Sequence, residues 1–209
     1  MMEDALAGIK MAPDLVAGYD LVNEEDTTPQ LLEFAKLILE GRKRGGDQGF
    51  SEGLPLYLHA GESVYRQNVN MYDAVLLGSK RIGHGNMLNQ NPELLELIKE
   101  RKVLIEICPI SSFLLGYCSD LRVHPSRYLL NRGVPVSLNS DDPGFWGYDG
   151  VTLDFAYATV AWQLDLKDLK QFALNAINYS SFSKEIRQEH LDIFQEEWTN
   201  FVKQSLGSL

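Results

Sequence analysis

The sequence predicts an α/β protein built on a parallel sheet. Short apolar runs alternate with longer segments of helical periodicity along the whole chain, which is typical of consecutive β/α units. Histidine, glutamate and aspartate side chains follow several of these runs, next to Gly, Ser or Pro. With 209 residues, 44% of them hydrophobic, the chain can bury one core. We therefore expect one domain with its active site at the carboxyl ends of the strands.

Composition excludes several classes of partner. The formal net charge is -10, whereas nucleic-acid binding requires clustered Lys and Arg. The short basic cluster Arg42 to Arg44 is interpreted as a solvated loop. No apolar run approaches the ~20 residues of a membrane span, and the start Met1 to Asp4 lacks an export-signal pattern. Two cysteines are too few for a disulfide framework, and Cys108 is expected to be a buried strand thiol. No nucleic-acid or membrane partner is expected.

The first half of the chain is expected to hold three strands and three helices. Thr28 is a suitable N-cap, and Pro29 suits the first position of a helix that runs to Gly41. Gly78 can end a later helix. The expected strands are 15–20, 54–58 and 81–83, the expected helices are 4–11, 28–41 and 72–77, and a glycine-rich loop covers 45–53.

The second half is expected to hold two more strands, followed only by helices. Asn91-Pro92 repeats the cap-then-proline start of a helix. The expected strands are 103–108 and 134–138, with a loop over 109–123, a helix over 126–130 that closes near Gly133, and helices over 153–163, 166–180 and 184–206. Aromatic residues at helical spacing in these last helices are expected to pack in the core: Phe155, Tyr157, Trp162, Phe172, Phe194 and Trp198.

The candidate catalytic residues follow three different strands. His59 and Glu62 follow the second, His84 follows the third, and Asp141-Asp142 follows the fifth. Histidine and carboxylate groups that converge from separate strands can support metal-assisted hydrolysis, in which a cation such as zinc lowers the pKa of a water toward about 7. Two alternatives stay open: each histidine alone is as consistent with a hydrogen-bonded strand end, and Asp141 to Gly144 is a turn sequence.

Four motifs together resemble the adenosine deaminase family, and the resemblance spans nearly the whole chain. They are His59-Ala-Gly-Glu62, Arg81-Ile-Gly-His84-Gly, Glu106-Ile-Cys-Pro-Ile-Ser111 and Ser137-Leu-Asn-Ser-Asp-Asp-Pro143. The sequence around these motifs, such as Ala17-Gly-Tyr-Asp-Leu-Val22, resembles the secreted, growth-factor-type branch. The resemblance implies a metallo-dependent hydrolase of the TIM-type (β/α) barrel class. It also implies one zinc ion and hydrolysis of adenosine or 2'-deoxyadenosine to inosine or 2'-deoxyinosine plus ammonia.

The resemblance also implies a role for each matched residue. His59 and Asp141 would be zinc ligands. Glu62 would donate a proton to N1 of the purine, and His84 would orient and deprotonate the attacking water. Asp142 would hydrogen-bond the N7 side of the purine, so that C6 of the small-molecule substrate faces the water.

The sequence departs from the family pattern in its metal ligands and in its length. The family takes two more zinc ligands from a His-x-His pair, which this sequence lacks; its other histidines, His124 and His190, are expected to be structural or exposed. The five expected strands match the last five of the family's eight. We therefore expect residues 1–209 to be the carboxy-terminal portion of the catalytic domain, without the first three β/α units and with impaired activity alone. Two sheet edges and part of an apolar barrel interior would be exposed, which favours a homo-oligomer or completion by an N-terminal segment.

Asn23 stands where the family has a glycine that lets the backbone approach the purine. The change either alters substrate choice or is a tolerated loop substitution. A deaminase of a related aminopurine therefore stays open, as does a catalytically inactive protein that binds purine nucleosides or a partner. The resembled branch is secreted or lysosomal; without a signal peptide, a cytoplasmic location is expected if the chain is the full product.

Overall fold

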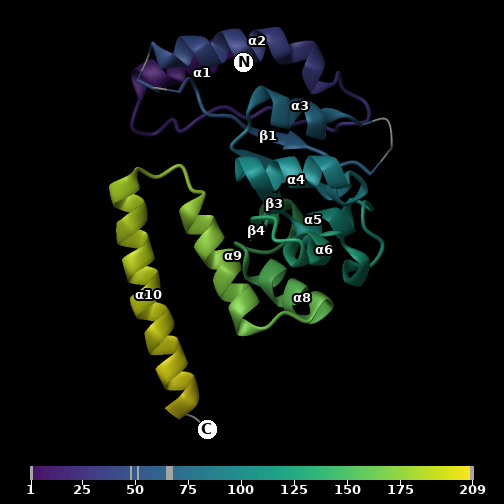
Figure 1. Cartoon of the computed structure of the whole chain (residues 1–209), viewed down its shortest axis with the longest axis vertical. Helices are drawn as coiled ribbons and strands as arrows, with labels where there is room; N and C mark the ends of the chain where they lie inside the picture. The colour runs from purple at the N-terminus through teal and green to yellow at the C-terminus, as the bar shows by residue number, and fades with distance from the viewer. Residues whose placement is uncertain (1, 48, 51, 65–67, 208–209) are drawn as a thin grey trace.

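The centre of the protein is a parallel sheet whose strands lie in chain order. The computed structural model describes residues 2–47, 49–50, 52–64 and 68–207. Its strands are β1 (Tyr57–Ala60), β2 (Arg81–His84), β3 (Leu104–Ile107) and β4 (Val136–Leu138), in the order β1-β2-β3-β4. Helices connect the strands and cover the sheet (Figure 1). The α/β class is thus confirmed, and the sheet is an open part of an α/β barrel.

The expected first strand, residues 15–20, is reduced to one parallel bridge between Tyr19 and Leu56. Two local features stop the ladder from extending. Pro55 accepts a hydrogen bond from the Tyr19 amide at 2.9 Å but has no N–H to return. Further along, the His59 amide donates to the Asp20 carboxylate at 3.2 Å rather than to a backbone carbonyl. The prediction of five full strands is therefore wrong by one, although the segment lies beside β1 as expected.

The helices follow the predicted order, with additions in the segments expected to be loops. They are α1 (Met2–Met11), α2 (Leu31–Gly46), α3 (Asn70–Leu77), η1 (Asn86–Gln90), α4 (Pro92–Arg101), α5 (Pro109–Leu114), η2 (Leu121–Val123), α6 (Ser126–Asn131), α7 (Pro143–Trp146), α8 (Thr152–Trp162), α9 (Leu166–Asn178) and α10 (Lys184–Gly207). Gly78 ends α3 in the left-handed conformation, as predicted. The loop predicted over 109–123 contains α5 and η2.

Helix α2 begins and ends later than the sequence predicts. The Thr28 hydroxyl donates to the Glu24 carbonyl at 2.6 Å, and Gln30 occupies the N-cap position of α2. The amide of Leu31 instead donates to the side chain of Asn70 at 2.9 Å. At its other end α2 runs through Gly46. The basic cluster Arg42 to Arg44 therefore lies on a helix and not in a loop.

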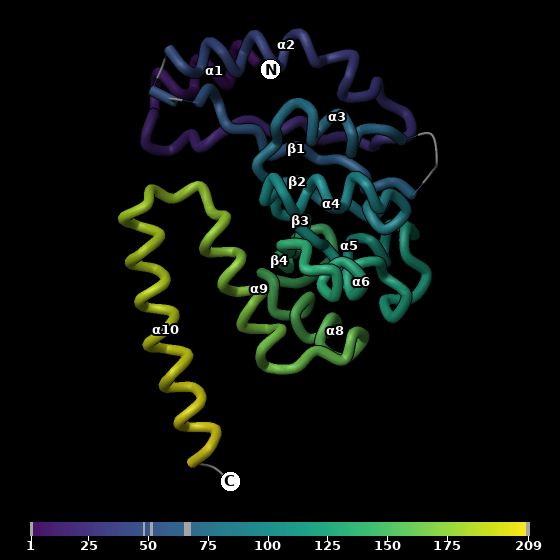
Figure 2. The backbone as a smooth tube through the Cα atoms, in the orientation of Figure 1, coloured from purple at the N-terminus to yellow at the C-terminus, as the bar shows by residue number. Residues whose placement is uncertain are grey.

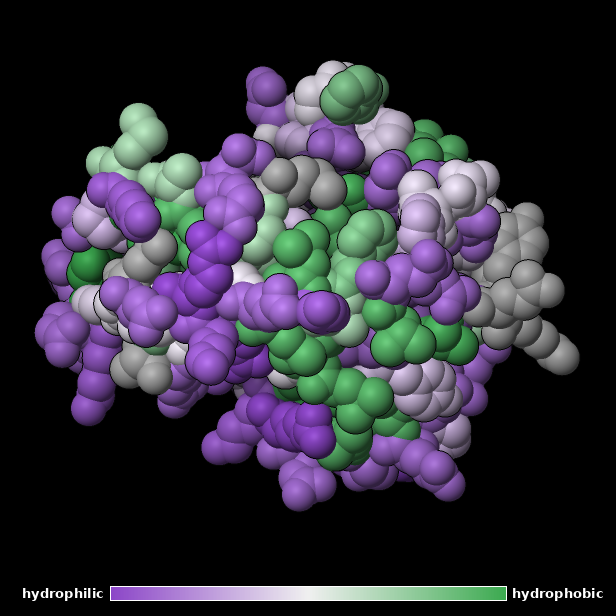
Figure 3. Space-filling view, turned by 90° about the horizontal axis from the view of Figure 1, so that it is seen from above, coloured by the Kyte–Doolittle hydropathy of each residue, from purple (hydrophilic) through white to green (hydrophobic). Residues whose placement is uncertain are grey.

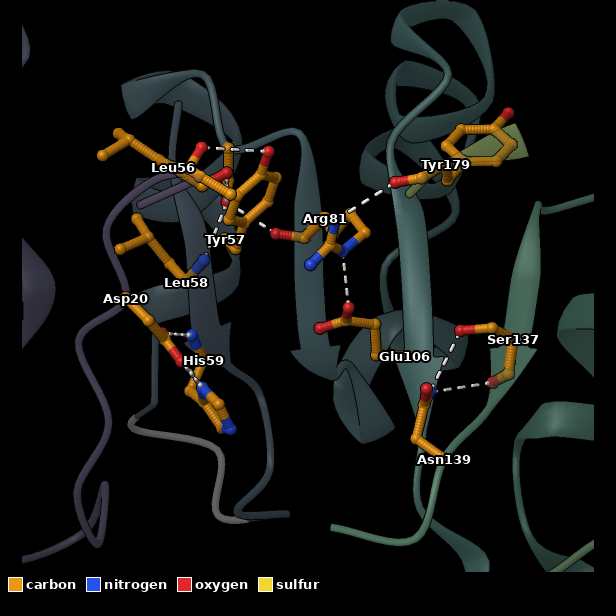
Figure 4. Close-up of polar contacts among 12 residues, drawn as sticks. Asp20, Leu56, Tyr57, Leu58, His59, Arg81, Glu106, Ser137, Asn139 and Tyr179 are labelled. Carbon is orange, nitrogen blue, oxygen red and sulfur yellow. Dashed lines mark hydrogen bonds and ion pairs between the residues drawn. The ribbon is translucent and has the colours of Figure 1, made fainter. Parts of the chain in front are cut away.

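The two faces of the sheet differ in chemistry. Leu58, Ile82, Ile105 and Val136 share one register row and are fully buried, and they pack in the main apolar core. On the other face, Tyr57, Arg81 and Glu106 are half-buried. Arg81 donates to Glu106 at 2.6 Å and lies over the ring of Tyr57 at 3.9 Å (Figure 4). The expectation of an apolar interior is therefore wrong for this face, which is polar.

The last three helices differ in how far they are buried. Helix α9 lies against β4, where the Asn175 side chain donates to the Val136 carbonyl at 2.7 Å. Trp162 of α8 and Phe172 of α9 are buried, as predicted, but Tyr157 is exposed. Helix α10 buries none of its described residues and extends away from the sheet (Figure 2). Its aromatic residues stack on one another instead, so the prediction of core packing is wrong there.

The surface over α1 and α2 combines apolar and hydrophilic areas. When the molecule is viewed from above, the side of α1 and α2, apolar side chains form a band between hydrophilic ones (Figure 3). Exposed apolar residues in this part of the chain include Met11, Leu32 and Leu39. Within the described ranges, none of the helices combines the length and apolar character that a membrane span needs.

Candidate metal and catalytic site

His59 lies near the carboxyl end of β1, and Asp20 holds it in place. The Asp20 carboxylate contacts the imidazole Nδ1 at 3.0 Å and accepts a hydrogen bond from the His59 amide at 3.2 Å (Figure 4). Burial lowers the pKa of His59, but the hydrogen bond and negative charge of Asp20 outweigh that effect and raise the pKa overall. With Nδ1 bound to Asp20, Nε2 is the nitrogen left for a ligand.

Glu62 follows β1 on a turn that requires glycine at position 61. Gly61 has φ +71°, and a Cβ atom there would lie 2.5 Å from Cγ of Met71. The Glu62 side chain is only 13% exposed. Burial is the main cause that raises its pKa to about 7, and the charges of Asp141 and Glu25 raise it further. Near neutral pH, Glu62 can therefore hold a proton and donate it.

His84 reaches the same site through an unusual backbone conformation. Strand alternation would place His84 on the face opposite His59, but its φ is 67°, in the left-handed region that non-glycine residues rarely adopt. Its ring centroid lies 5.2 Å from that of His59, and its Nε2 lies 3.6 Å from Oε1 of Glu62. Burial first, and then the charge of His59, lowers the pKa of His84 below its ordinary value. The ring is therefore neutral near pH 7.

Asp141 and Asp142 follow β4 on a constrained loop. Asp141 also has a positive φ, 56°, and the Tyr148 hydroxyl lies 3.3 Å from the Ser140 carbonyl and 2.9 Å from the Asp154 carboxylate. Asp142 occupies the N-cap position of α7 and is exposed. Its side chain forms no cap hydrogen bond, which is consistent with a group that faces a ligand.

Three of these residues form a cluster that can hold a metal ion. One ligand atom each of His59, His84 and Asp141 lies within 4.8 Å of the others. Two ligands of one tetrahedral zinc, with bonds of about 2.0 to 2.2 Å, lie about 3.3 to 3.6 Å apart. The three side chains would therefore have to move closer together by up to about 1 Å to bind the ion. Imidazole and carboxylate groups are also the donors that zinc accepts in catalytic sites, so the residues fit the ion.

Asn23 lies beside this cluster, and its backbone conformation does not require a glycine. A cavity of about 160 Å³ is lined by residues that include Asn23, Glu25 and His59. Asn23 is exposed, and its side chain accepts a hydrogen bond from the Glu24 amide at 2.9 Å. Its φ is not positive. The glycine of the family pattern is therefore not required here by backbone geometry.

The remaining histidines and Cys108 lie outside the cluster. His124 is buried, with Nδ1 2.7 Å from the Ser126 hydroxyl and its ring beside Trp162. His190 is exposed on α10. Cys108 is buried one residue beyond β3. His124 is thus structural and His190 exposed, as predicted; Cys108 is buried as predicted but is not in the strand, because β3 ends at Ile107.

Sequence reasoning missed three residues that shape the site. It assigned no role to Asp20, which orients His59, or to Glu25, which contacts the turn of Glu62. It also missed Gly83, which pairs with His59 in the sheet and lies against its ring. One sequence signal pointed to Asp20, since an acidic residue ended the strand candidate that precedes β1.

Comparison with known proteins gives a family match and relatives that are much longer. The family model described as adenosine deaminase matches residues 3–197. Adenosine deaminase 2 of Dictyostelium discoideum is 42% identical over 191 residues, which are 91% of this chain and 35% of that protein. The chain spans 35 to 41% of the length of this relative and four other curated relatives.

Solved structures show the same fold. Adenine deaminase from Arthrobacter aurescens superposes with a TM-score of 0.78 at 24% identity, over 95% of this chain and 58% of that one. An amidohydrolase from Burkhoderia ambifaria with bound Zn gives 0.77 at 24% identity, over 100% and 56%. At such identities these structures support the fold alone.

Proposed function

The chain belongs to the adenosine deaminase family, and we propose that it forms the carboxy-terminal portion of an enzyme that deaminates adenosine or 2'-deoxyadenosine by hydrolysis. One observation carries the proposal. Glu62, His84 and Asp141 come from three different strand ends, yet all lie around His59 at one edge of the sheet. The reaction needs a proton donor, a proton acceptor and a cation site within reach of one ring carbon, and we propose that the groups at this edge fill these three roles.

The proton states of Glu62 and His84 suit opposite roles. Glu62, with its pKa raised to about 7, keeps a proton that it donates to N1 of the purine, which makes C6 more electrophilic. His84, with its pKa lowered, is neutral and accepts a proton from the attacking water. Two titratable groups 3.6 Å apart whose environments shift their pKa values in opposite directions are typical of acid–base catalysis.

The contacts of the two histidines distinguish a ligand from a base. The carboxylate of Asp20 contacts Nδ1 of His59, which is the usual support of a metal-binding imidazole. His84 Nδ1 is buried without a hydrogen-bond partner among the described residues, and its Nε2 faces Glu62. We therefore assign His59 and Asp141 as the zinc ligands and His84 as the base. Bound zinc would supply Lewis acidity and lower the pKa of a water toward about 7.

Substrate is held on the exposed side of the cluster. Asp142, with no partner for its side chain in the α7 cap, is placed to bind the N7 side of the purine. Asn23 lines the cavity beside His59 and is positioned to affect which aminopurine enters. Adenosine is the proposed substrate, and the two residues are proposed to hold the ring so that C6 faces the water.

Two zinc ligands do not complete a catalytic zinc site, which takes three protein ligands and a water. We propose that further ligands come from another segment, either an N-terminal part of the same protein or a second copy. The relatives, of which this chain spans about a third, supply the length for such a segment. By its resemblance to the growth-factor-type branch, the whole protein is proposed to act outside the cell or in the lysosome.

A complementation experiment tests the proposal. The chain is produced alone and together with the preceding portion of the Dictyostelium discoideum relative, and zinc content and ammonia release are measured with adenosine, 2'-deoxyadenosine, adenine and AMP. We expect stoichiometric zinc and adenosine turnover in the complemented protein and much weaker turnover in the chain alone. His59→Ala and Asp141→Ala should lose zinc, whereas His190→Ala, an exposed histidine on α10, should not.

Each outcome decides between functions. Turnover of adenine or AMP in place of adenosine would identify a deaminase of another aminopurine. Zinc-loaded protein that binds adenosine without releasing ammonia would leave only a binding function and overturn the proposal.

A further inference from the structure

Glu25 is a buried carboxylate that holds the turn on which Glu62 lies. We propose that Glu25 is a positioning residue, whose carboxylate fixes the backbone on both sides of Glu62 and so sets where that side chain points. The inference rests on the proposed function, because it concerns the proton donor of that reaction. Glu25 itself lies in the segment between Tyr19 and α2 and touches the turn from outside the sheet.

The two carboxylate oxygens bracket Glu62. Oε1 accepts a hydrogen bond from the Gly61 amide at 2.9 Å, and Oε2 accepts one from the Ser63 amide at 3.0 Å. The residues before and after Glu62 are therefore tied to one rigid group. Glu25 is 9% exposed and Ser63 is fully buried, so water cannot easily replace these bonds.

The same carboxylate is anchored on its other side to two helices. Asn70, in the first turn of α3, donates to Oε1 at 2.9 Å, and Asn68 donates to Oε2 at 2.6 Å. The Asn70 side chain also accepts the first amide of α2, that of Leu31, at 2.9 Å. The position of the turn is thus fixed relative to α2 and α3.

Only a carboxylate satisfies this set of contacts. Two backbone amides and two side-chain amides, all of them donors, converge on Glu25. An ionised carboxylate is an acceptor at all of its lone pairs, whereas a glutamine presents an NH₂ group to two of the donors. Hydrogen bonds to a charged acceptor are also about twice as strong as neutral ones.

The restraint matters because the turn contains a glycine. Gly61 has φ +71° and few conformational limits of its own, so Glu62 would otherwise move relative to His84. His59 does not depend on this restraint, because Asp20 holds its ring and its amide. Loss of Glu25 should therefore impair the proton donor and leave the metal ligand in place.

The test compares Glu25→Gln with Asp73→Asn. Asp73 is a matched control: it is also a carboxylate that is 9% exposed, and it lies in the first turn of α3. Its Oδ2 has no hydrogen-bond partner among the described residues. Amide hydrogen exchange of the metal-free chain is followed by NMR. In Glu25→Gln, exchange at Gly61 and Ser63 should rise about tenfold or more, as expected for the loss of a hydrogen bond to a charged group, while Asp73→Asn leaves both amides protected.

Activity gives the second measurement, in the complemented protein. Glu25→Gln should lower kcat about 100-fold, the effect of misplacing a catalytic group by about 1 Å, with KM and zinc affinity little changed. Unchanged exchange at Gly61 and Ser63 in Glu25→Gln, or an equal rise in Asp73→Asn, overturns the inference. If Glu25→Gln does not fold, the wild type provides the test: Gly61 and Ser63 amides that exchange as fast as free amides overturn the inference.

The exchange measurement separates this inference from the proposed function. A wild-type protein that never deaminates adenosine would overturn the function, yet the exchange rates would still show whether Glu25 holds the turn. Turnover that survives Glu25→Gln at full kcat would overturn the positioning role and leave the proposed function intact.

Discussion

A single methyl group at position 83 should displace His59 and weaken zinc binding. Gly83 pairs with His59 across β1 and β2, and the imidazole ring lies against the place that a Cβ atom would occupy at position 83. In Gly83→Ala, the new Cβ would lie 3.0 Å from Cδ2, 3.1 Å from Cγ and 3.2 Å from Nε2 of His59. Carbon atoms pack at about 3.5 to 4.0 Å, so the ring must withdraw by about half an ångström.

That displacement exceeds what a metal site tolerates. Ligand distances in zinc sites stay within about 0.2 Å of their preferred values. We therefore expect the affinity for zinc to fall about 10- to 100-fold, as it does when the support of a ligand is lost. Stability should change less. Crowding costs about 1 to 3 kcal/mol, and replacement of glycine restores about 0.4 to 1 kcal/mol, which leaves a net loss of about 1 kcal/mol.

The assay is competition for zinc against a chromophoric chelator at fixed pH, because protons compete for the same ligands. Gly144→Ala is the control: position 144 lies on α7, and a Cβ there has nothing within 4 Å. It should bind zinc as the wild type does. Equal zinc affinity in Gly83→Ala and Gly144→Ala would refute the reasoning that Gly83 sets the position of His59.

Three further substitutions test other parts of the site and sheet. Glu62→Gln should lower kcat about 10²- to 10⁴-fold. Because the pKa of Glu62 is raised to about 7, the kcat of the wild type should fall above that pH. For the same reason the wild type should lose stability relative to Glu62→Gln as pH rises from about 4.5 to 7. A pH-independent wild-type kcat would contradict this. Asp20→Asn should lower the pKa of His59, seen by NMR titration, and weaken zinc binding about 10- to 100-fold, while an unchanged His59 titration would argue against the pairing. Arg81→Gln should cost about 1 to 3 kcal/mol in denaturant unfolding, because Arg81 and Glu106 are only 20% and 23% exposed; Arg122→Gln, which breaks an exposed pair with Asp120, should leave stability unchanged.

Local signals in the sequence placed several elements correctly. Pro92 stands at the first position of α4, and Gly78 ends α3 in the left-handed conformation that glycine favours. Each of these two signals depends on the conformational limits of one residue, so it acts without a tertiary contact. The start of α2 did not follow its local signal, because Asn70 of another helix supplies the partner for its first amide.

The sequence by itself determined the class of fold, the family and the residue types of the site. Alternating β/α patterns and motifs at strand ends are local properties, and parallel strands bring their carboxyl ends together at one edge of the sheet. Tertiary structure decided the distances and the charge states. The left-handed backbone that brings His84 to His59 depends on packing between strands. The same is true of the burial that raises the pKa of Glu62 and of the contacts of Asp20 and Glu25. These join residues about 40 positions apart in the chain, and a local sequence pattern holds no information on such long-range contacts.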